Sequence, residues 1–248
     1  MREIKCEDII KTVKQLCKEA ACNLPEDVFN TIKNKAESEP YPLAKKTLDV
    51  LVENAILAKE QMMPICQDTG MAFVYVTIGQ EVHQGYQEGY LRKSVVDDPL
   101  FDRVNTKDNT PAIIYFDIVA GDEFKIVVAP KGFGSENMSQ VKMLKPSDGV
   151  QGVKDFVLKV VNDAGPNACP PMVIGVGIGG SFDKVTMLAK KAMLREIGTH
   201  HQDSRYALLE DELLQLVNAS GIGPAGYGGK TTALSLNIET YPTHIAGM

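Results

Sequence analysis

The periodicity of apolar residues changes near residue 70, and this change most restricts the fold that the chain can adopt. Before it, apolar side chains recur about every 3.6 residues, as in amphipathic helices. This pattern covers residues 4–20, 26–36 and 43–59. After it, Ala72–Gly79 is rich in β-branched and aromatic residues and ends at a glycine, which is typical of a strand. The sequence therefore predicts an α+β fold that begins with a helical layer.

The remaining segments predict further strands and helices. Strands are expected at 112–119 and 123–129, and the turn Ala120-Gly121-Asp122 between them indicates a hairpin. A short helix is expected at 84–92, a strand at 172–176, and helices at 150–163, 183–197 and 204–219. We find no internal repeat, low-complexity tract or linker. We therefore expect one domain over residues 1–248, with a small, largely antiparallel sheet flanked by helices.

Composition narrows the class of protein. The chain has 248 residues and a net charge of −6, which argues against a general role in binding nucleic acid or membrane surfaces. An anionic substrate would need a local cationic pocket. No apolar run approaches the roughly 18 residues of a membrane span, and the N-terminus has no signal-peptide core. Five cysteines without a secretory signal indicate reduced thiols. A cytoplasmic enzyme is the expectation.

Two cysteines lie among turn-forming and polar residues. Cys66 precedes Gln-Asp-Thr-Gly, and Cys169 precedes two prolines. No histidine is near either in sequence, so a Cys–His nucleophile pair gains no local support. Thiolates are soft metal ligands, so these loops predict a metal or iron–sulfur site assembled by the fold. The alternative is two ordinary buried cysteines, which spacing alone favours. Cys17 lies on the helical stripe and is expected in the core, whereas Cys6 and Cys22 lack a motif.

Two glycine runs resemble nucleotide-binding motifs. Gly175–Gly180 satisfies G-x-G-x-x-G, but no clear βαβ unit continues to a strand that ends in an acidic residue, so dinucleotide binding is disfavoured. Gly226–Thr231 resembles a phosphate-binding loop, but the glycine required six places before Lys230 is Pro224. Both runs, and the loop 130–137, stay candidates for loops whose backbone amides approach an anion such as a carboxylate.

A set of motifs in fixed order runs over nearly the whole chain from about residue 10. The set comprises Cys66-Gln-Asp-Thr-Gly70, Leu91-Arg-Lys-Ser94, 105–111, 131–137, 167–171, 175–180, Gly221-Ile-Gly-Pro224 and His244. Together these motifs resemble the α subunit of the iron–sulfur-dependent hydro-lyases, the family of class I fumarate hydratase and L-tartrate dehydratase. The order and specificity of the set make it far stronger than any single glycine pattern.

The resemblance implies a [4Fe–4S] cluster held by three cysteines, with one iron open to substrate. Cys66 and Cys169 match two of the ligands. The third matches a position after Met248, so we expect a C-terminal tail that the sequence lacks. The positions that contact substrate match Gln67, Asp68, Arg92, Gly134 and His244, and Asp68 also matches a catalytic position. Further site residues, including a catalytic threonine, are implied on a β subunit, so the chain is expected to act in a hetero-oligomer.

The residue types suit this chemistry. Dehydration of malate breaks a C–O bond and removes a weakly acidic proton, and an iron with an open site acts as a Lewis acid. Arg92 offers bidentate carboxylate recognition, although it could be a solvated charge at a helix end. Asp68 could instead cap its turn. Arg103, His83, His200 and His201 match no motif and are expected at the surface. For one cluster, the sulfurs of Cys66 and Cys169 should lie roughly 6 to 7 Å apart.

Three functions stay open. The first is reversible hydration of fumarate to (S)-malate, which the Leu91–Ser94 and Gly229–Thr232 stretches favour. The second is dehydration of L-tartrate or a methylated malate by the same chemistry. The third is a non-catalytic scaffold that binds a dicarboxylate or a partner without a cluster.

Overall fold

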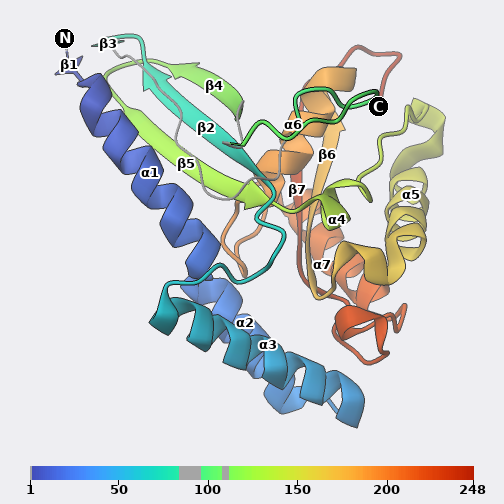
Figure 1. Cartoon of the computed structure of the whole chain (residues 1–248). Helices are drawn as coiled ribbons and strands as arrows, with labels where there is room; N and C mark the ends of the chain where they lie inside the picture. The colour runs from blue at the N-terminus through green and yellow to red at the C-terminus, as the bar shows by residue number, and fades with distance from the viewer. Residues whose placement is uncertain (1, 84–95, 108–111) are drawn as a thin grey trace. The chain divides into compact units, whose positions relative to one another are not determined.

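The computed structural model describes residues 2–83, 96–107 and 112–248 (Figure 1). Its internal contacts divide the chain into two compact units, and each is described by itself. Unit 1 comprises Met1–Pro25 and Asn54–Phe133, and unit 2 comprises Glu26–Glu53 and Gly134–Met248. Each unit combines helices with at least one small sheet, which confirms the predicted α+β class. The prediction of one domain over 1–248 stays a prediction.

Unit 1 is a helix packed on a three-stranded sheet. The helix is α1 (Cys6–Cys22), and the sheet order is β4 (Ile113–Val119), β2 (Met71–Gly79) and β5 (Phe124–Lys131). Ile9, Val13 and Cys17 on one face of α1 are buried against apolar side chains of β5. The apolar stripe and the core position of Cys17 are therefore confirmed. Burial also raises the pKa of the Cys17 thiol. A second pair, β1 (Arg2–Glu3) and β3 (Val82–His83), is parallel.

The predicted hairpin is wrong, because β2 lies between β4 and β5. β2 pairs parallel to β4 and antiparallel to β5. Four successive residues of β2, 73–76, are buried, so this strand is covered on both faces and takes the central position. The turn after β4 instead closes over the end of β2, where Gly79 donates its N–H to Glu123 O at 2.7 Å. A Cβ at Gly79 would lie 2.2 Å from Gly121 O, so only glycine fits there.

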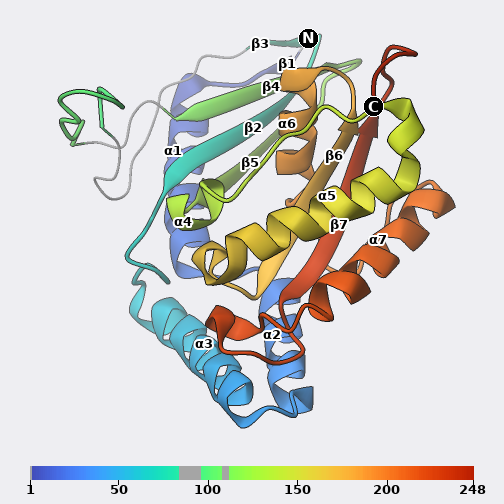
Figure 2. The same ribbon diagram turned by 90° about the vertical axis from the view of Figure 1, so that its right-hand side faces the viewer.

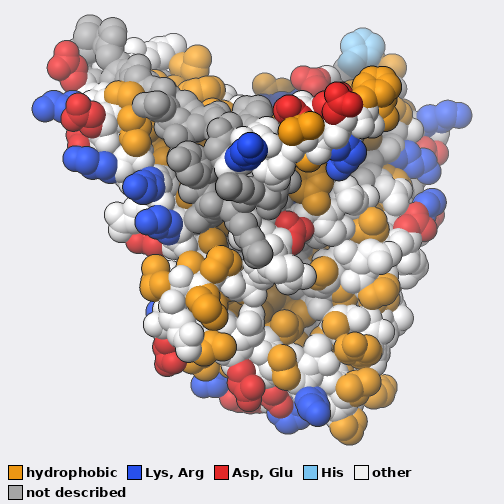
Figure 3. Space-filling view, in the orientation of Figure 1, with side chains coloured by type: hydrophobic (Ala, Val, Ile, Leu, Met, Phe, Trp, Pro, Cys, Tyr) orange, Lys and Arg blue, Asp and Glu red, His pale blue; other side chains and the backbone are white. Residues whose placement is uncertain are grey.

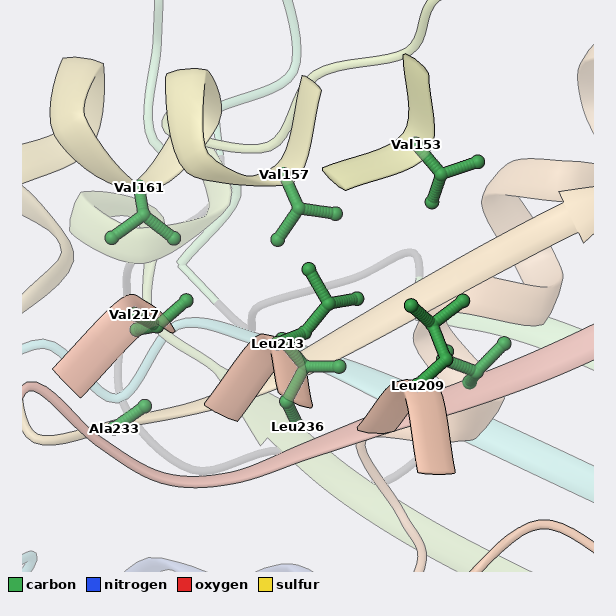
Figure 4. Packing of buried hydrophobic residues seen from close by; sticks show 9 residues of the cluster. Val153, Val157, Val161, Leu209, Leu213, Val217, Ala233 and Leu236 are labelled. Carbon is green, nitrogen blue, oxygen red and sulfur yellow. The ribbon is translucent and has the colours of Figure 1, made fainter. Parts of the chain in front are cut away.

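Unit 2 is built around two parallel strands, β6 (Met172–Gly179) and β7 (Ala233–Tyr241). Figure 2 shows α5 (Gly149–Ala164) and α7 (Ser204–Asn218) beside these strands. Valines of α5 face the apolar side chains of α7 and Leu236 of β7 (Figure 4). The cluster consists of Val153, Val157, Val161, Leu209, Leu213, Val217, Ala233, Leu236 and Ile238. The expected antiparallel character is thus corrected, since among the described strands only β2 and β5 pair antiparallel.

The other face of the β6–β7 sheet is covered by α6 (Phe182–Ala192). A Cβ at Gly175 would lie 2.0 Å from Ala189 O, and one at Gly177 would lie 2.2 Å from Val185 O. These glycines therefore let α6 pack directly on the strand. The sequence analysis did not predict β7, whose polar residues alternate with apolar ones. In the structure Asn237 is buried and donates to Ala192 O at 3.0 Å, so both faces of β7 are covered.

The remaining helices largely match their predicted positions. They are α2 (Glu26–Ser38), which lies in unit 2, and α3 (Pro42–Gln61), which begins in unit 2 and ends in unit 1. Helix α6 ends five residues before its predicted end at 197, and turns follow around Arg195. The helix predicted at 84–92 lies outside the described residues. Within the described part of the chain, no helix combines the length and apolarity needed to cross a membrane.

The face drawn in Figure 3 carries basic and acidic side chains interspersed outside its grey residues. Such mixing agrees with the modest net charge of −6. A site for an anionic substrate would therefore depend on individual placed residues rather than on a broad basic surface.

Candidate functional site

The Cys66 loop connects α3 to β2 in unit 1. Cys66 is exposed, and its thiol lies 3.5 Å from Oε1 of Gln67. Asp68 follows, and its two carboxylate oxygens accept separate main-chain hydrogen bonds, one from Gly70 N and one from Phe133 N, each 2.9 Å long. The first bond is the turn cap that the sequence offered as an alternative. The second ties the loop to the chain just after β5, so the carboxylate has a fixed orientation.

Glycine makes this loop possible. Gly70 has a φ of +65°, and a Cβ there would lie 2.0 Å from Lys131 O. A Cβ at Gly132 would lie 3.1 Å from Oδ2 of Asp68. The Cys66 loop and the end of β5 therefore approach each other at main-chain distance.

The Cys169 turn lies in unit 2, between the 3₁₀ helix η2 (Gly165–Ala168) and β6. Cys169 is exposed and adopts a left-handed conformation with φ of +55°. Its N–H donates to Pro166 O at 3.0 Å. A Cβ at Gly134, in the short helix α4 (Phe133–Glu136), would lie 3.9 Å from Cys169 Sγ and 3.3 Å from Asn167 O. The structure therefore brings Gly134 and Cys169 together, and the missing side chain at 134 leaves space beside the sulfur.

Two consecutive residues thus make these contacts, Phe133 with Asp68 in unit 1 and Gly134 with Cys169 in unit 2. The distance between Cys66 and Cys169 stays a prediction, because the two thiols belong to different units. Arg92 lies outside the described residues.

His244 lies at the far end of unit 2 from Cys169. It follows β7, where Thr243 donates its hydroxyl to Gly180 O at 2.9 Å, just past the end of β6. Cys169 instead precedes β6. With a rise of about 3.3 Å per residue, the strand from Met172 to Gly179 separates these ends by about 23 Å. His244 is exposed, and its Nδ1 accepts from Ala246 N at 3.2 Å. The structure therefore does not bring His244 to Cys169.

The surroundings of His244 form a shallow hollow that is open to solvent. The residues that line it are Gly180, Ser181, Asp183, Lys184, Tyr241, Pro242, Thr243 and His244. The Ser181 hydroxyl and nearby main-chain N–H groups lower the pKa of Asp183 below its ordinary value. Lys184 lies over the ring of Tyr241, with its Nζ 4.8 Å from the ring centroid. The ionised Asp183 thus offsets the positive charge of this hollow.

The glycine run 226–231 does not offer its amides as predicted. Lys230 N donates to both carboxylate oxygens of Glu39, at 3.0 and 3.2 Å. Gly228 N donates to Ile222 O at 2.9 Å. The idea that these amides receive an anionic ligand is therefore corrected, since a side chain of the protein itself occupies that role. Sequence reasoning missed Glu39, because no motif marks a lone carboxylate between two helices.

A second missed residue is Lys190 of α6. It forms an ion pair with Glu136 of α4, and both side chains are largely buried. The pair fastens the short helix that carries Gly134. Nothing local in the sequence marks the contact, because 54 positions separate its partners.

The two loop thiols suit the implied iron–sulfur group by their chemistry. Both are exposed and neither forms a disulfide. Soft thiolates are the usual ligands of such clusters. Across the described residues, no group of three or more His, Cys, Asp or Glu side chains is placed to hold a metal ion. The donor type therefore fits, and the described residues supply two thiols of the set that the resemblance implies.

Comparison with known proteins identifies the family. A family model described as Fumarate hydratase (Fumerase) matches residues 10–248. A protein of Methanocaldococcus jannaschii, provisionally named L(+)-tartrate dehydratase subunit alpha, is 42% identical over 97% of this chain and 91% of its own length. The L(+)-tartrate dehydratase subunit alpha of Escherichia coli K12 is 32% identical over 89% of this chain and 78% of its own length. These matches define a hydro-lyase. The chain belongs to the fumarate hydratase (Fumerase) family, as its motifs predicted.

Proposed function

We propose that the chain is the α subunit of an iron–sulfur-dependent hydro-lyase that interconverts fumarate and (S)-malate. The observation that carries the proposal is that both motif cysteines are exposed on turns, within a family match that spans residues 10–248. Relatives named as alpha subunits support a β subunit as partner. That subunit would complete the site.

Cys66 and Cys169 would hold the cluster, together with a third ligand. When bound, the cluster would supply an open iron as a Lewis acid for the hydroxyl group that leaves. Gly134, which has no side chain, would leave room for substrate beside Cys169. Gln67 would offer its amide to a substrate carboxylate. Arg92 would pair with a carboxylate through two parallel hydrogen bonds.

Asp68 would take part in transferring the proton that leaves the substrate carbon. Removal of the proton from the carbon next to the C–O bond builds negative charge on the neighbouring carboxylate. A main-chain N–H holds each oxygen of Asp68, so its remaining lone pairs keep fixed directions. Asp68 would relay the proton with the threonine expected on the β subunit. The resemblance also implies a substrate contact for His244; this contact would require the chain after Tyr241 to reach the substrate in the assembled enzyme, and His244→Ala tests it.

The decisive experiment is co-expression with the β subunit under anaerobic conditions, followed by iron and sulfide analysis and assays with fumarate, (S)-malate and L-tartrate. We expect bound iron and sulfide, and a kcat/KM for fumarate at least about tenfold above that for L-tartrate. Binding of dicarboxylates without turnover or iron would favour the scaffold alternative instead.

Dehydration of L-tartrate is the second candidate, and the names of the relatives favour it. Tartrate carries a second hydroxyl group. A site with a hydrogen-bonding partner for that hydroxyl would leave the partner unsatisfied with malate, and would therefore discriminate strongly against malate. The same assay panel separates the two candidates, because preference for L-tartrate reverses the expected ratio.

Replacement of Arg92 by lysine tests substrate recognition. A lysine keeps the charge but lacks the planar guanidinium that forms two parallel hydrogen bonds with a carboxylate. The loss of transition-state stabilisation, calculated from the ratio of the two kcat/KM values, should therefore be about 2 to 3 kcal/mol. The midpoint of thermal unfolding should change little. Kinetics equal to those of the unchanged enzyme would remove Arg92 from the site.

A further inference from the structure

Glu39 is a buried carboxylate in the connection between α2 and α3, and only 5% of its surface is exposed. Its oxygens accept hydrogen bonds from Lys230 N at 3.0 and 3.2 Å, and from the Thr231 hydroxyl at 3.2 Å. Tyr41 N adds a fourth contact at 3.3 Å. Burial of a carboxylate is unfavourable unless its oxygens receive such bonds. Glu39 therefore fastens the end of the segment 221–232, here called the glycine loop.

The glycine loop folds tightly on itself and on Glu39. Gly223 has a φ of +70°, and a Cβ there would lie 1.8 Å from Gly228 O. Gly229 has a φ of +114°, and a Cβ there would lie 3.1 Å from Oε1 of Glu39. A Cβ at Gly229 would also lie 2.6 Å from Ala44 Cβ, so the positive φ and this close approach require glycine where the loop passes the carboxylate.

The other side of the glycine loop contacts the Cys169 turn. Ala225 N donates to Pro170 O at 2.8 Å, directly after the cysteine. A Cβ at Gly226 would lie 2.6 Å from Pro166 Cβ, and Pro166 O is the acceptor for the N–H of Cys169. The loop therefore contacts the turn on both sides of the cysteine. All of these contacts lie within unit 2.

We infer that Glu39 is a positioning residue for Cys169, because it fixes the glycine loop and the loop in turn fixes the orientation of the Cys169 turn. A thiolate ligand whose turn is already ordered needs no rearrangement to bind metal. The inference rests on the proposed function only for what Cys169 binds. The positioning itself is a property of the chain.

Hydrogen exchange measured by mass spectrometry on the full-length protein tests the inference. Glu39→Ala should speed exchange in the peptides covering 165–171 and 221–232 by about tenfold, and leave the peptides of unit 1 unchanged. Thr231→Val keeps the side-chain shape and removes one hydrogen bond, so it should act on the same peptides by about threefold. Thr231→Val also allows the same exchange experiment if Glu39→Ala does not fold.

Glu210→Gln is the matched control, because Glu210 is also buried and accepts main-chain bonds, from Ile238 and His201. It should speed exchange most near those residues, and any acceleration at 165–171 should be smaller than in Glu39→Ala. Unchanged exchange at 165–171 in Glu39→Ala, or equal acceleration in all peptides, would overturn the inference.

Loss of iron to a chelator from the reconstituted enzyme gives a second readout. Glu39→Ala should lose iron several-fold faster than Glu210→Gln. Equal rates of loss would contradict a role in holding the ligand. If the unchanged protein takes up no iron, the proposed function fails, while the exchange experiment still decides the role of Glu39.

Discussion

The two ends of the β6–β7 sheet differ in how firmly the chain is held. At the start of β6, the Cys169 turn contacts the glycine loop, and the loop contacts the buried carboxylate of Glu39. At the end of β6, residues 241–244 border a shallow hollow that is open to solvent. In parallel sheets, ligands usually bind beyond the carboxyl ends of the strands. Here the ordered end carries the cysteine and is the amino end.

This difference explains why the glycines of β6 do not act as a nucleotide motif. Gly175 and Gly177 face α6 within the strand, so they serve close packing of helix on sheet. A dinucleotide fingerprint would place its glycines in the turn after the strand, around a phosphate. The glycines that support the candidate site are instead those of the loop at the amino end. The contrast suggests four further tests.

The largest effect is expected at the ordered end. Cys169→Ser should abolish iron retention and lower activity at least about a hundredfold, because a serine hydroxyl is a poor substitute for a thiolate. Iron analysis and turnover of the reconstituted enzyme measure this. Cys6→Ser is the control, since Cys6 lies at the start of α1 without a motif, and it should retain both properties. Full iron content in Cys169→Ser would show that the ordered turn serves another purpose.

The second effect concerns the stability of the sheet between the two ends. Glu210 is 2% exposed, pairs with Arg195 at 2.8 Å and accepts Ile238 N at 2.7 Å. Glu210→Gln removes the buried counter-charge of Arg195 and leaves the guanidinium with the more exposed Glu239 at 3.5 Å, so it should lower the free energy of unfolding by about 2 kcal/mol. Urea unfolding at neutral pH measures the change. A loss below about 0.5 kcal/mol would indicate that the pair is replaceable.

The same carboxylate predicts a pH dependence. Burial acts to raise the pKa of Glu210, but hydrogen bonds from Arg195, Ile238 N and His201 N outweigh it, and the pKa lies below its ordinary value of 4.5. Its contribution to stability is therefore present above pH 4.5 and is lost as the pH falls through the lowered pKa. Stability measured from pH 6 to pH 3 should fall less steeply in Glu210→Gln than in the unchanged protein.

The smallest effect is expected at the open end. Strand β6, about 23 Å long, separates His244 from the Cys169 turn. Because of this separation, His244→Ala should change kcat/KM by less than about threefold. Assays with fumarate and (S)-malate measure it. A loss of a hundredfold or more would break the comparison, because it would mean that the chain after Tyr241 reaches the substrate in the assembled enzyme, as the motif resemblance implies.

Local sequence determined most helices, the strand β2 and the loop positions of Cys66 and Cys169. Periodicity and turn residues act over a few neighbours, so they can be read without knowledge of the fold. The motif order also determined the family, which the comparisons confirm. The site residues themselves stay predictions.

Only the tertiary structure decided how distant segments pair. It set β2 between β4 and β5, made β6 and β7 parallel, and buried the polar residues of β7. It also joined Glu39 to Lys230 across 191 positions, and placed Cys169 and His244 at opposite ends of one sheet. The physical reason is that a buried carboxylate or strand edge is satisfied by whichever partner the packed chain brings to it, and no local pattern records that partner.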